Sequence, residues 1–228
     1  MLKLIRLEWK KNNIVKYVRN AFVMTMILLL LILAVAGELE TNETVLAYGG
    51  SMLKSGVELF TNMSFIVFTS AMLAAFIVNS YKNKTINLMF SYPISRKKIL
   101  LSQMLSVWIF NFTALVLSKI LLYAVLVMTK EYMLITAADI ALGSGMFYME
   151  IFVNSAVMVS ISFIALLIGL RMKSSKATII AGVIIVCLTQ GNIGAYTLID
   201  NIPFHATLLM LSALSVFLTL YKLEMRDV

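Results

Sequence analysis

Apolar runs separated by short polar or charged intervals dominate the sequence. Six runs are candidates for membrane spans, and they cover residues 21–36, 57–78, 99–128, 150–170, 177–199 and 204–221. In the fifth run the helix is expected to end at about Gln190, because Gly191 and Gly194 interrupt it. About 20 apolar residues in an α-helix cross a hydrocarbon core of about 30 Å. A helix also satisfies its own backbone hydrogen bonds in lipid. The pattern therefore predicts an all-α, polytopic membrane protein with six transmembrane helices.

Charged residues are divided unequally between the intervals on the two sides of these spans. Residues 1–20, 79–98, 169–176 and the tail after residue 221 hold sixteen of the nineteen Lys and Arg residues. The intervals on the other side hold Lys54, Lys130 and eight of the eleven acids. Lys and Arg accumulate in cytoplasmic loops. The distribution predicts that the N-terminus and the C-terminus are both cytoplasmic, in a multi-pass protein of the cell membrane.

Residues 1–20 are predicted to form an N-terminal amphipathic segment ahead of the transmembrane domain, which comprises residues 21–228. Leu2, Ile5 and Trp9 fall on one helical stripe, and cations occupy the adjacent stripe. Such a helix lies in the headgroup region with its cations toward anionic lipid. The alternative is that this helix contacts a partner protein.

Several polar residues interrupt the apolar runs. Asn111 is expected in mid-membrane, where an amide forms hydrogen bonds between helices. Lys119 lies twenty residues after Ile99, about 30 Å along a helix, so we expect its ammonium to reach the outer boundary. The alternative for each is a place on a substrate path or gate. The full set of candidate path or gate residues is Asn111, Lys119, Asn154, Gln190, Gly191, Asn192 and Gly194.

The motifs of common enzymes and metal sites are absent from the sequence. There is no GxxxxGK[ST], HExxH or EF-hand spacing, and the single cysteine, Cys187, excludes a CxxC pair. The sequence places no charge pair in mid-membrane of the kind that secondary transporters use to couple ions. We predict no catalytic residue, no metal site and no enzymatic activity in this chain. The net charge of +8 is explained by basic residues beside spans, so no nucleic-acid partner is predicted.

The interval 79–98 has the most specific local pattern. It holds five Lys or Arg residues and no acid. Ile86, Met89 and Phe90 share one side of a short predicted helix, which Tyr92-Pro93 ends, and Ser95 is a candidate N-cap. The interval is either a positive membrane anchor or a structured element that docks on a cytoplasmic partner.

The residues of this interval resemble a motif of the membrane subunits of ABC-2-type exporters. The similar residues are Lys84-Thr85, Leu88-Met89, Tyr92-Pro93-Ile94-Ser95-Arg96 and Ile99-Leu100. Lys84 stands where the family favours glycine, Gln103 lies near a usual lysine, and the acid that often precedes the threonine is absent. The close match covers about twenty residues, and the rest of the chain matches in topology.

The resemblance implies a coupling loop that seats in a separate cytoplasmic ABC ATPase subunit. A second permease subunit, identical or different, completes the transporter. ATP and Mg²⁺ are bound by the ATPase, and no cofactor is bound by this chain. The implied ATPase-coupling residues are Lys82, Lys84, Thr85, Ile86, Met89, Phe90, Tyr92, Pro93 and Arg96.

The expected function is that of a permease subunit of an ATP-driven bacterial exporter. Small six-span members of the family resemble exporters for peptide antibiotics, which implies an amphiphilic cargo such as an antimicrobial peptide or a lipid-like compound. Antibiotic resistance or bacteriocin immunity is the implied role. The alternative is a membrane scaffold or receptor subunit that binds anionic lipid or a signalling partner and transports nothing.

Overall fold

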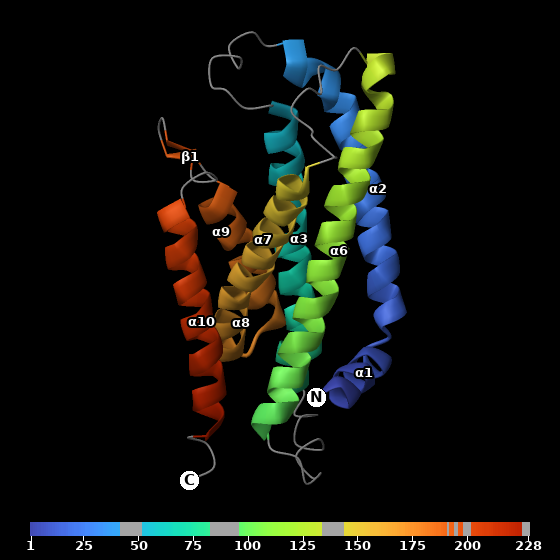
Figure 1. Ribbon diagram of the computed structural model, residues 1–228. Helices are drawn as coiled ribbons and strands as arrows, with labels where there is room; N and C mark the ends of the chain where they lie inside the picture. The colour runs from blue at the N-terminus through green and yellow to red at the C-terminus, as the bar shows by residue number, and fades with distance from the viewer. Residues whose placement is uncertain are drawn as a thin grey trace. The chain divides into compact units, whose positions relative to one another are not determined.

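The computed structural model describes residues 1–41, 52–82, 96–133, 144–190, 192–193, 196–197 and 202–224. Nearly all of them are helical (Figure 1). The helices are α1 (Leu2–Lys11), α2 (Ile14–Thr41), α3 (Met52–Leu73), the π-helix η2 (Ala74–Val78), α4 (Asn79–Lys82), α6 (Arg96–Met133), α7 (Gly145–Ile161), α8 (Phe163–Met172), α9 (Ser175–Gln190) and α10 (Ile202–Glu224). Two short strands, β1 (Asn192–Ile193) and β2 (Tyr196–Thr197), pair between α9 and α10.

Five helical stretches in the described part of the chain are long and apolar enough to cross a membrane. They are Ile14–Val35, Lys54–Lys82, Lys97–Thr129, Gly145–Met172 and Pro203–Tyr221. They match the predicted first, second, third, fourth and sixth spans. The prediction of an all-α protein embedded in a membrane is confirmed.

The predicted fifth span, 177–199, is helical only as far as Gln190. Helix α9 has 16 residues, about 24 Å, which is shorter than the hydrocarbon core. The chain then forms an antiparallel pair in which Asn192 is opposite Thr197 and Ile193 is opposite Tyr196. Helix α9 thus ends where the interruption at Gly191 was expected. Gly191 disfavours continuation of the helix, and the strand pair supplies backbone hydrogen bonds in its place.

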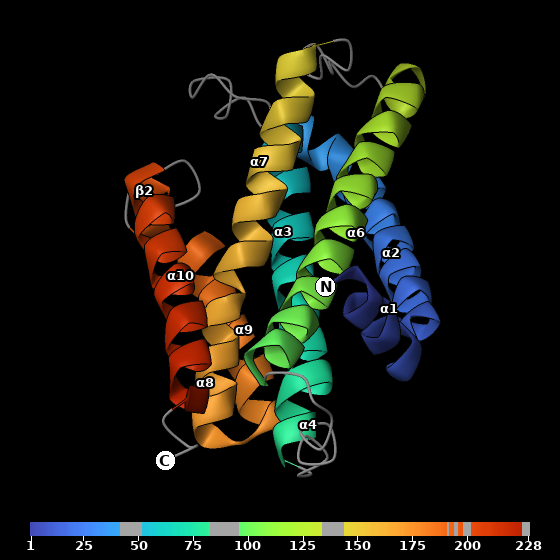
Figure 2. The ribbon, with the colours of Figure 1, turned by 60° about the horizontal axis from the view of Figure 1, so that its bottom comes forward.

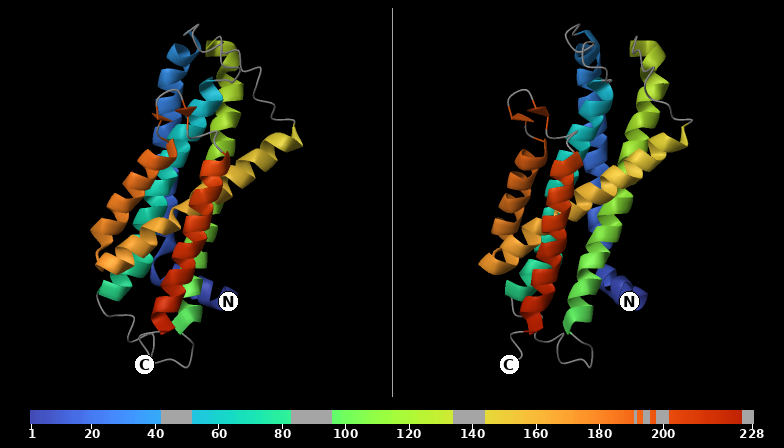
Figure 3. Two further views of the ribbon diagram at one scale, coloured as in Figure 1. Left: turned by 90° about the vertical axis from the view of Figure 1, so that its left-hand side faces the viewer. Right: turned by 60° about the vertical axis from the view of Figure 1, so that its left-hand side comes forward.

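The chain divides into two compact units. Unit 1 comprises Met1–Ile14, Phe65–Phe112 and Ala156–Val228, and unit 2 comprises Val15–Ser64 and Thr113–Ser155. Helices α3, α6 and α7 each continue from one unit into the other. Within unit 1, α1, α4, the start of α6 and the end of α10 lie at the same end (Figures 1 and 3). These are the basic stretches that the charge distribution assigns to the cytoplasmic side.

Helix α10 has its polar side chains toward the protein and its apolar side chains outward. Ser212, Ser215 and Thr219 are buried, whereas Met210 and Phe217 are 75% and 66% exposed. Helix α8 lies beside α10 (Figure 2). The Ser215 hydroxyl donates to the Phe163 carbonyl of α8 at 3.0 Å. A helix in water would show the opposite arrangement. The pattern is that of a helix solvated by lipid.

Glycines allow close approach of helices within unit 1. A Cβ at Gly169 of α8 would overlap the side chain of Thr178 on α9. A Cβ at Gly182 of α9 would overlap the side chain of Ser70 on α3. Small residues at such contacts let helix backbones pack closely in lipid, where apolar burial supplies no driving force.

We expect Gly182→Ala and Gly169→Ala each to lower the free energy of unfolding by about 1–3 kcal/mol, because the added methyl group overpacks a close contact. Gly145→Ala is the matched control, since no atom outside its own helix lies within 4 Å of a Cβ there. Thermal unfolding of the detergent-solubilised protein measures the difference. Ser70→Gly should restore part of the stability lost in Gly182→Ala. Equal midpoints for Gly145→Ala and Gly182→Ala would contradict the packing argument.

Candidate functional site

Unit 2 contains a buried polar network formed by three spans. Lys119 of α6 donates from Nζ to Oδ1 of Asn154 on α7 at 2.8 Å. Asn154 donates from Nδ2 to Oε2 of Glu58 on α3 at 3.4 Å. Lys119 is completely buried and Glu58 is 9% exposed. The amide of Asn154 therefore bridges a cation and a carboxylate inside apolar helices.

A second polar contact lies one helical turn along the same two spans. Lys54 Nζ is 2.9 Å from Oε1 and 2.8 Å from Oε2 of Glu150. Lys54 precedes Glu58 by four residues on α3, and Glu150 precedes Asn154 by four residues on α7. Residues four apart share a helix face, so α3 and α7 pair twice along one seam. The Lys54–Glu150 pair is solvent-accessible and contributes little to stability.

The structure corrects one expectation about these residues. The Lys119 ammonium does not extend out of the protein, as snorkelling requires, because its side chain is buried and its ammonium is held by Asn154. The link between the opposite charges of Glu58 and Lys119 through Asn154 was not predicted from the sequence. The four-residue spacing of Lys54 with Glu58 and of Glu150 with Asn154 is the feature of the sequence that could have indicated this network. Ionisable groups in a membrane segment are expensive unless they are paired, so they mark structural or functional sites.

Of the other candidate path residues, Asn111 and Gln190 have described side chains, and both lie in unit 1. Asn111 belongs to unit 1, where its Nδ2 donates to the Val107 carbonyl at 2.9 Å and lies 3.3 Å from Sδ of Met72 on α3. The expected contact between helices is thus present. Gln190 is buried at the end of α9, and Asn192 lies in β1, both in unit 1. Gly191 and Gly194 lie outside the described residues.

Most of the predicted ATPase-coupling residues also lie outside the part of the chain that the structure describes. These are Lys84, Thr85, Ile86, Met89, Phe90, Tyr92 and Pro93. Lys82 is exposed at the end of α4, and Arg96 is the first residue of α6. Their role remains a prediction.

The segment before the coupling interval has a feature that the sequence did not predict. The second span changes from α-helix to π-helix over Ala74–Val78, and α4 follows directly. Ser80 of α4 donates its hydroxyl to the Phe76 carbonyl at 3.0 Å. Single π-turns are rare within α-helices and are frequent at functional sites.

The N-terminal helix α1 contacts the first part of α6, just beyond the coupling interval. Gln103 Nε2 donates to Oε1 of Glu8 at 3.3 Å, and Trp9 Nε1 donates to the Ser106 carbonyl at 3.2 Å. Ile5 and Glu8 are buried. The contact of Trp9 with α6 was not predicted from the sequence.

The predicted segment 1–20 is divided by a break at Asn12 and Asn13. Asn13 has a φ of 50°, in the left-handed region that asparagine tolerates better than most residues. Residues 14–20 belong to α2, so the amphipathic helix proper is Leu2–Lys11. The conformation of Asn13 separates α1 from α2 as two helices.

Asn154→Leu should lower the free energy of unfolding by about 3 kcal/mol, because it removes the amide that holds the buried Lys119 ammonium. Addition of Lys119→Met should restore much of the loss. Lys54→Met, which disrupts the exposed pair on the same seam, should cost less than about 1 kcal/mol. The measurement is thermal unfolding in detergent. Equal losses for Asn154→Leu and Lys54→Met would contradict the role assigned to the network.

Glu8→Leu should release α1 from α6, since it removes the acceptor of the Gln103 amide. Amide hydrogen exchange of residues 4–11 is expected to accelerate about five- to tenfold, in line with the loss of one hydrogen bond that contributes about 1 kcal/mol. Glu8→Gln retains an acceptor oxygen and is the control. Unchanged exchange in Glu8→Leu would show that the contact does not hold α1.

Comparison with known proteins gives one informative similarity. No family model matches the chain. The chain is 28% identical over 192 residues to the uncharacterized protein YcbO of Bacillus subtilis (strain 168), and the match covers 82% of each protein. No solved structure matches. The chain is therefore similar, along most of its length, to a bacterial protein.

Proposed function

We propose that the chain is a membrane-spanning permease subunit of an ATP-driven ABC exporter in a bacterial plasma membrane. Its cargo would be amphiphilic, such as an antimicrobial peptide or a lipid-like compound. The chain itself would not hydrolyse ATP, because its sequence has no GxxxxGK[ST] phosphate-binding loop. Hydrolysis of ATP would take place in a cytoplasmic partner subunit, and a second permease subunit would complete the translocation path.

The observation that carries this proposal is the way both flanks of the basic interval 79–98 are attached. The interval contains the ABC-2-like residues, from Lys84 to Ile99. On one side the interval begins with α4, which directly follows the buried π-helix η2. On the other side it continues into α6, to which α1 is hydrogen-bonded through Glu8 and Trp9. An element with firm attachments on both sides is suited to pass a displacement into the spans.

The π-helix supports the same proposal. A domain motion requires a place where a helix changes its hydrogen-bond pattern or bends. Residues Ala74–Val78 provide that place in the second span, directly before the interval that would receive the force. Force from a closing ATPase would therefore reach α3 through η2 and reach α6 directly.

The polar network in unit 2 would then keep the outer parts of three spans together during this motion. Glu58, Lys119 and Asn154 come from α3, α6 and α7. The cargo path would lie between two permease subunits. Opposite charges joined inside one subunit are better suited to hold these helices than to bind a mobile cargo.

The test is purification of the tagged chain from its native host in mild detergent, followed by identification of bound proteins and measurement of ATP hydrolysis. The wild-type chain should retain a soluble protein that carries a phosphate-binding loop. Met89→Asp combined with Phe90→Asp should abolish this association, because both acids would enter the apolar contact with the ATPase.

The matched control for this pair is Met172→Asp combined with Lys176→Asp. Both control positions are exposed, at the turn between α8 and α9. The control should retain the ATPase and its activity. If no ATP-binding subunit co-purifies with the wild-type chain, the result would contradict the proposal and favour the scaffold or receptor alternative.

A further inference from the structure

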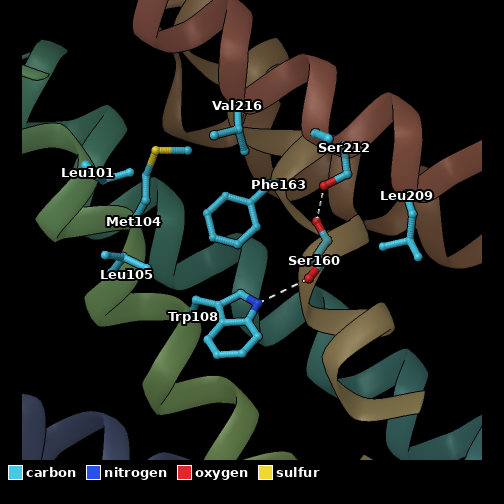
Figure 4. Close-up of a pocket in the computed structure, with 10 residues that line it drawn as sticks. Leu101, Met104, Leu105, Trp108, Ser160, Phe163, Leu209, Ser212 and Val216 are labelled. Carbon is cyan, nitrogen blue, oxygen red and sulfur yellow. Dashed lines mark hydrogen bonds between the residues drawn. The ribbon is translucent and has the colours of Figure 1, made fainter. Parts of the chain in front are cut away.

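A cavity of about 680 Å³ lies in unit 1. Leu101, Leu105 and Trp108 line it from α6, and Leu209 and Val216 line it from α10. Figure 4 shows the side chains of these two helices facing each other across the ring of Phe163, which comes from α8. The size is typical of a ligand-binding pocket, which commonly measures about 300–1,000 Å³.

The polar groups in the wall of this cavity already have partners. Trp108 donates from Nε1 to the Ser160 hydroxyl at 3.2 Å, and that hydroxyl donates to the Ala156 carbonyl at 2.7 Å. The Ser212 hydroxyl donates to the Ser160 carbonyl. The remaining wall is hydrocarbon and aromatic ring. An apolar chain is therefore the ligand chemistry that fits the interior.

The end of the cavity nearest the start of α6 is flanked by positive charge. Lys97 and Lys98 are exposed and precede Leu101 by four and three residues. Residues at these spacings share a helix face, so the two lysines continue the line of Leu101, Leu105 and Trp108. Lys97 to Trp108 spans eleven residues, about 16 Å of helix. One leaflet contributes about 15 Å to the hydrocarbon core.

We propose that this cavity binds one anionic phospholipid. The lysine pair, Lys97 and Lys98, would hold the headgroup, and an acyl chain would lie along α6 from Leu101 to Trp108. The length of the site matches one leaflet, the interior matches a hydrocarbon chain, and the charge at its end matches an anionic headgroup. The site requires a membrane-embedded chain and is independent of whether the protein exports a cargo.

The sequence allows a direct optical test, because its two tryptophans are Trp9 and Trp108. In the Trp9→Phe protein, all tryptophan fluorescence comes from the cavity. Phosphatidylglycerol with brominated acyl chains, added to the protein in detergent micelles, should quench this fluorescence in a saturable manner. Unbrominated phosphatidylglycerol should reverse the quenching. Phosphatidylcholine with the same brominated chains should need at least a tenfold higher concentration.

Two pairs of variants separate the acyl-chain contact from the headgroup contact. Ala213→Phe, which places a ring in the cavity wall, should weaken the quenching, whereas Leu214→Phe, on the lipid-exposed side of α10, should not. Lys97→Gln with Lys98→Gln should weaken the apparent affinity about fivefold per lysine, and Lys173→Gln with Lys176→Gln should leave it unchanged.

Three results would overturn the proposal. Equal quenching by the two lipids would show that the site does not select an anionic headgroup. Insensitivity to Ala213→Phe would show that Trp108 contacts only the surrounding lipid. Saturable quenching that persists in Trp108→Phe, which retains Trp9, would place the lipid elsewhere. Unfolding midpoints of all variants in detergent confirm that each comparison is made between folded proteins.

Discussion

The helices of this protein are solvated by hydrocarbon, and this constraint governs how they associate. Apolar side chains such as Met210 and Phe217 gain nothing by leaving lipid, so they face outward. Association therefore depends on close backbone contacts and on hydrogen bonds between helices. Gly169 and Gly182 provide the close contacts, and hydroxyl groups such as that of Ser215 provide bonds to neighbouring carbonyls.

The same constraint explains why a charged network can persist inside the spans. An isolated Lys119 would be costly in hydrocarbon, but an amide that accepts from it and donates to Glu58 lowers the cost for both. The network consequently fixes the rotation of three helices in unit 2. In unit 1, the contact of Glu8 with Gln103 fixes α1 on α6 in a comparable way. Polar groups thus specify which helix faces meet, a task that the uniform apolar surfaces cannot perform.

The spans were predictable because hydropathy and length are local properties of the sequence. Five of them appear where long apolar runs occur. The end of α9 at Gln190 agrees with the interruption that Gly191 predicts, because glycine is a poor helix former. The break at Asn13 does not change the pattern of hydrophobic residues, so it was not predicted. The partners of Lys119 and Trp9 could not be predicted, because they depend on helix rotation and on residues more than thirty positions away. The coupling residues Lys84–Pro93 remain predictions from motif resemblance.

The most direct test of the proposed function is photo-cross-linking in living cells from a reactive amino acid placed at residue 89. The account predicts a cross-link to a cytoplasmic ATP-binding subunit, identified by mass spectrometry, at residues 86, 89 and 90 but not at residue 172. The absence of such a cross-link in a functional protein, or a cross-link to a protein on the outer side of the membrane, would contradict the account.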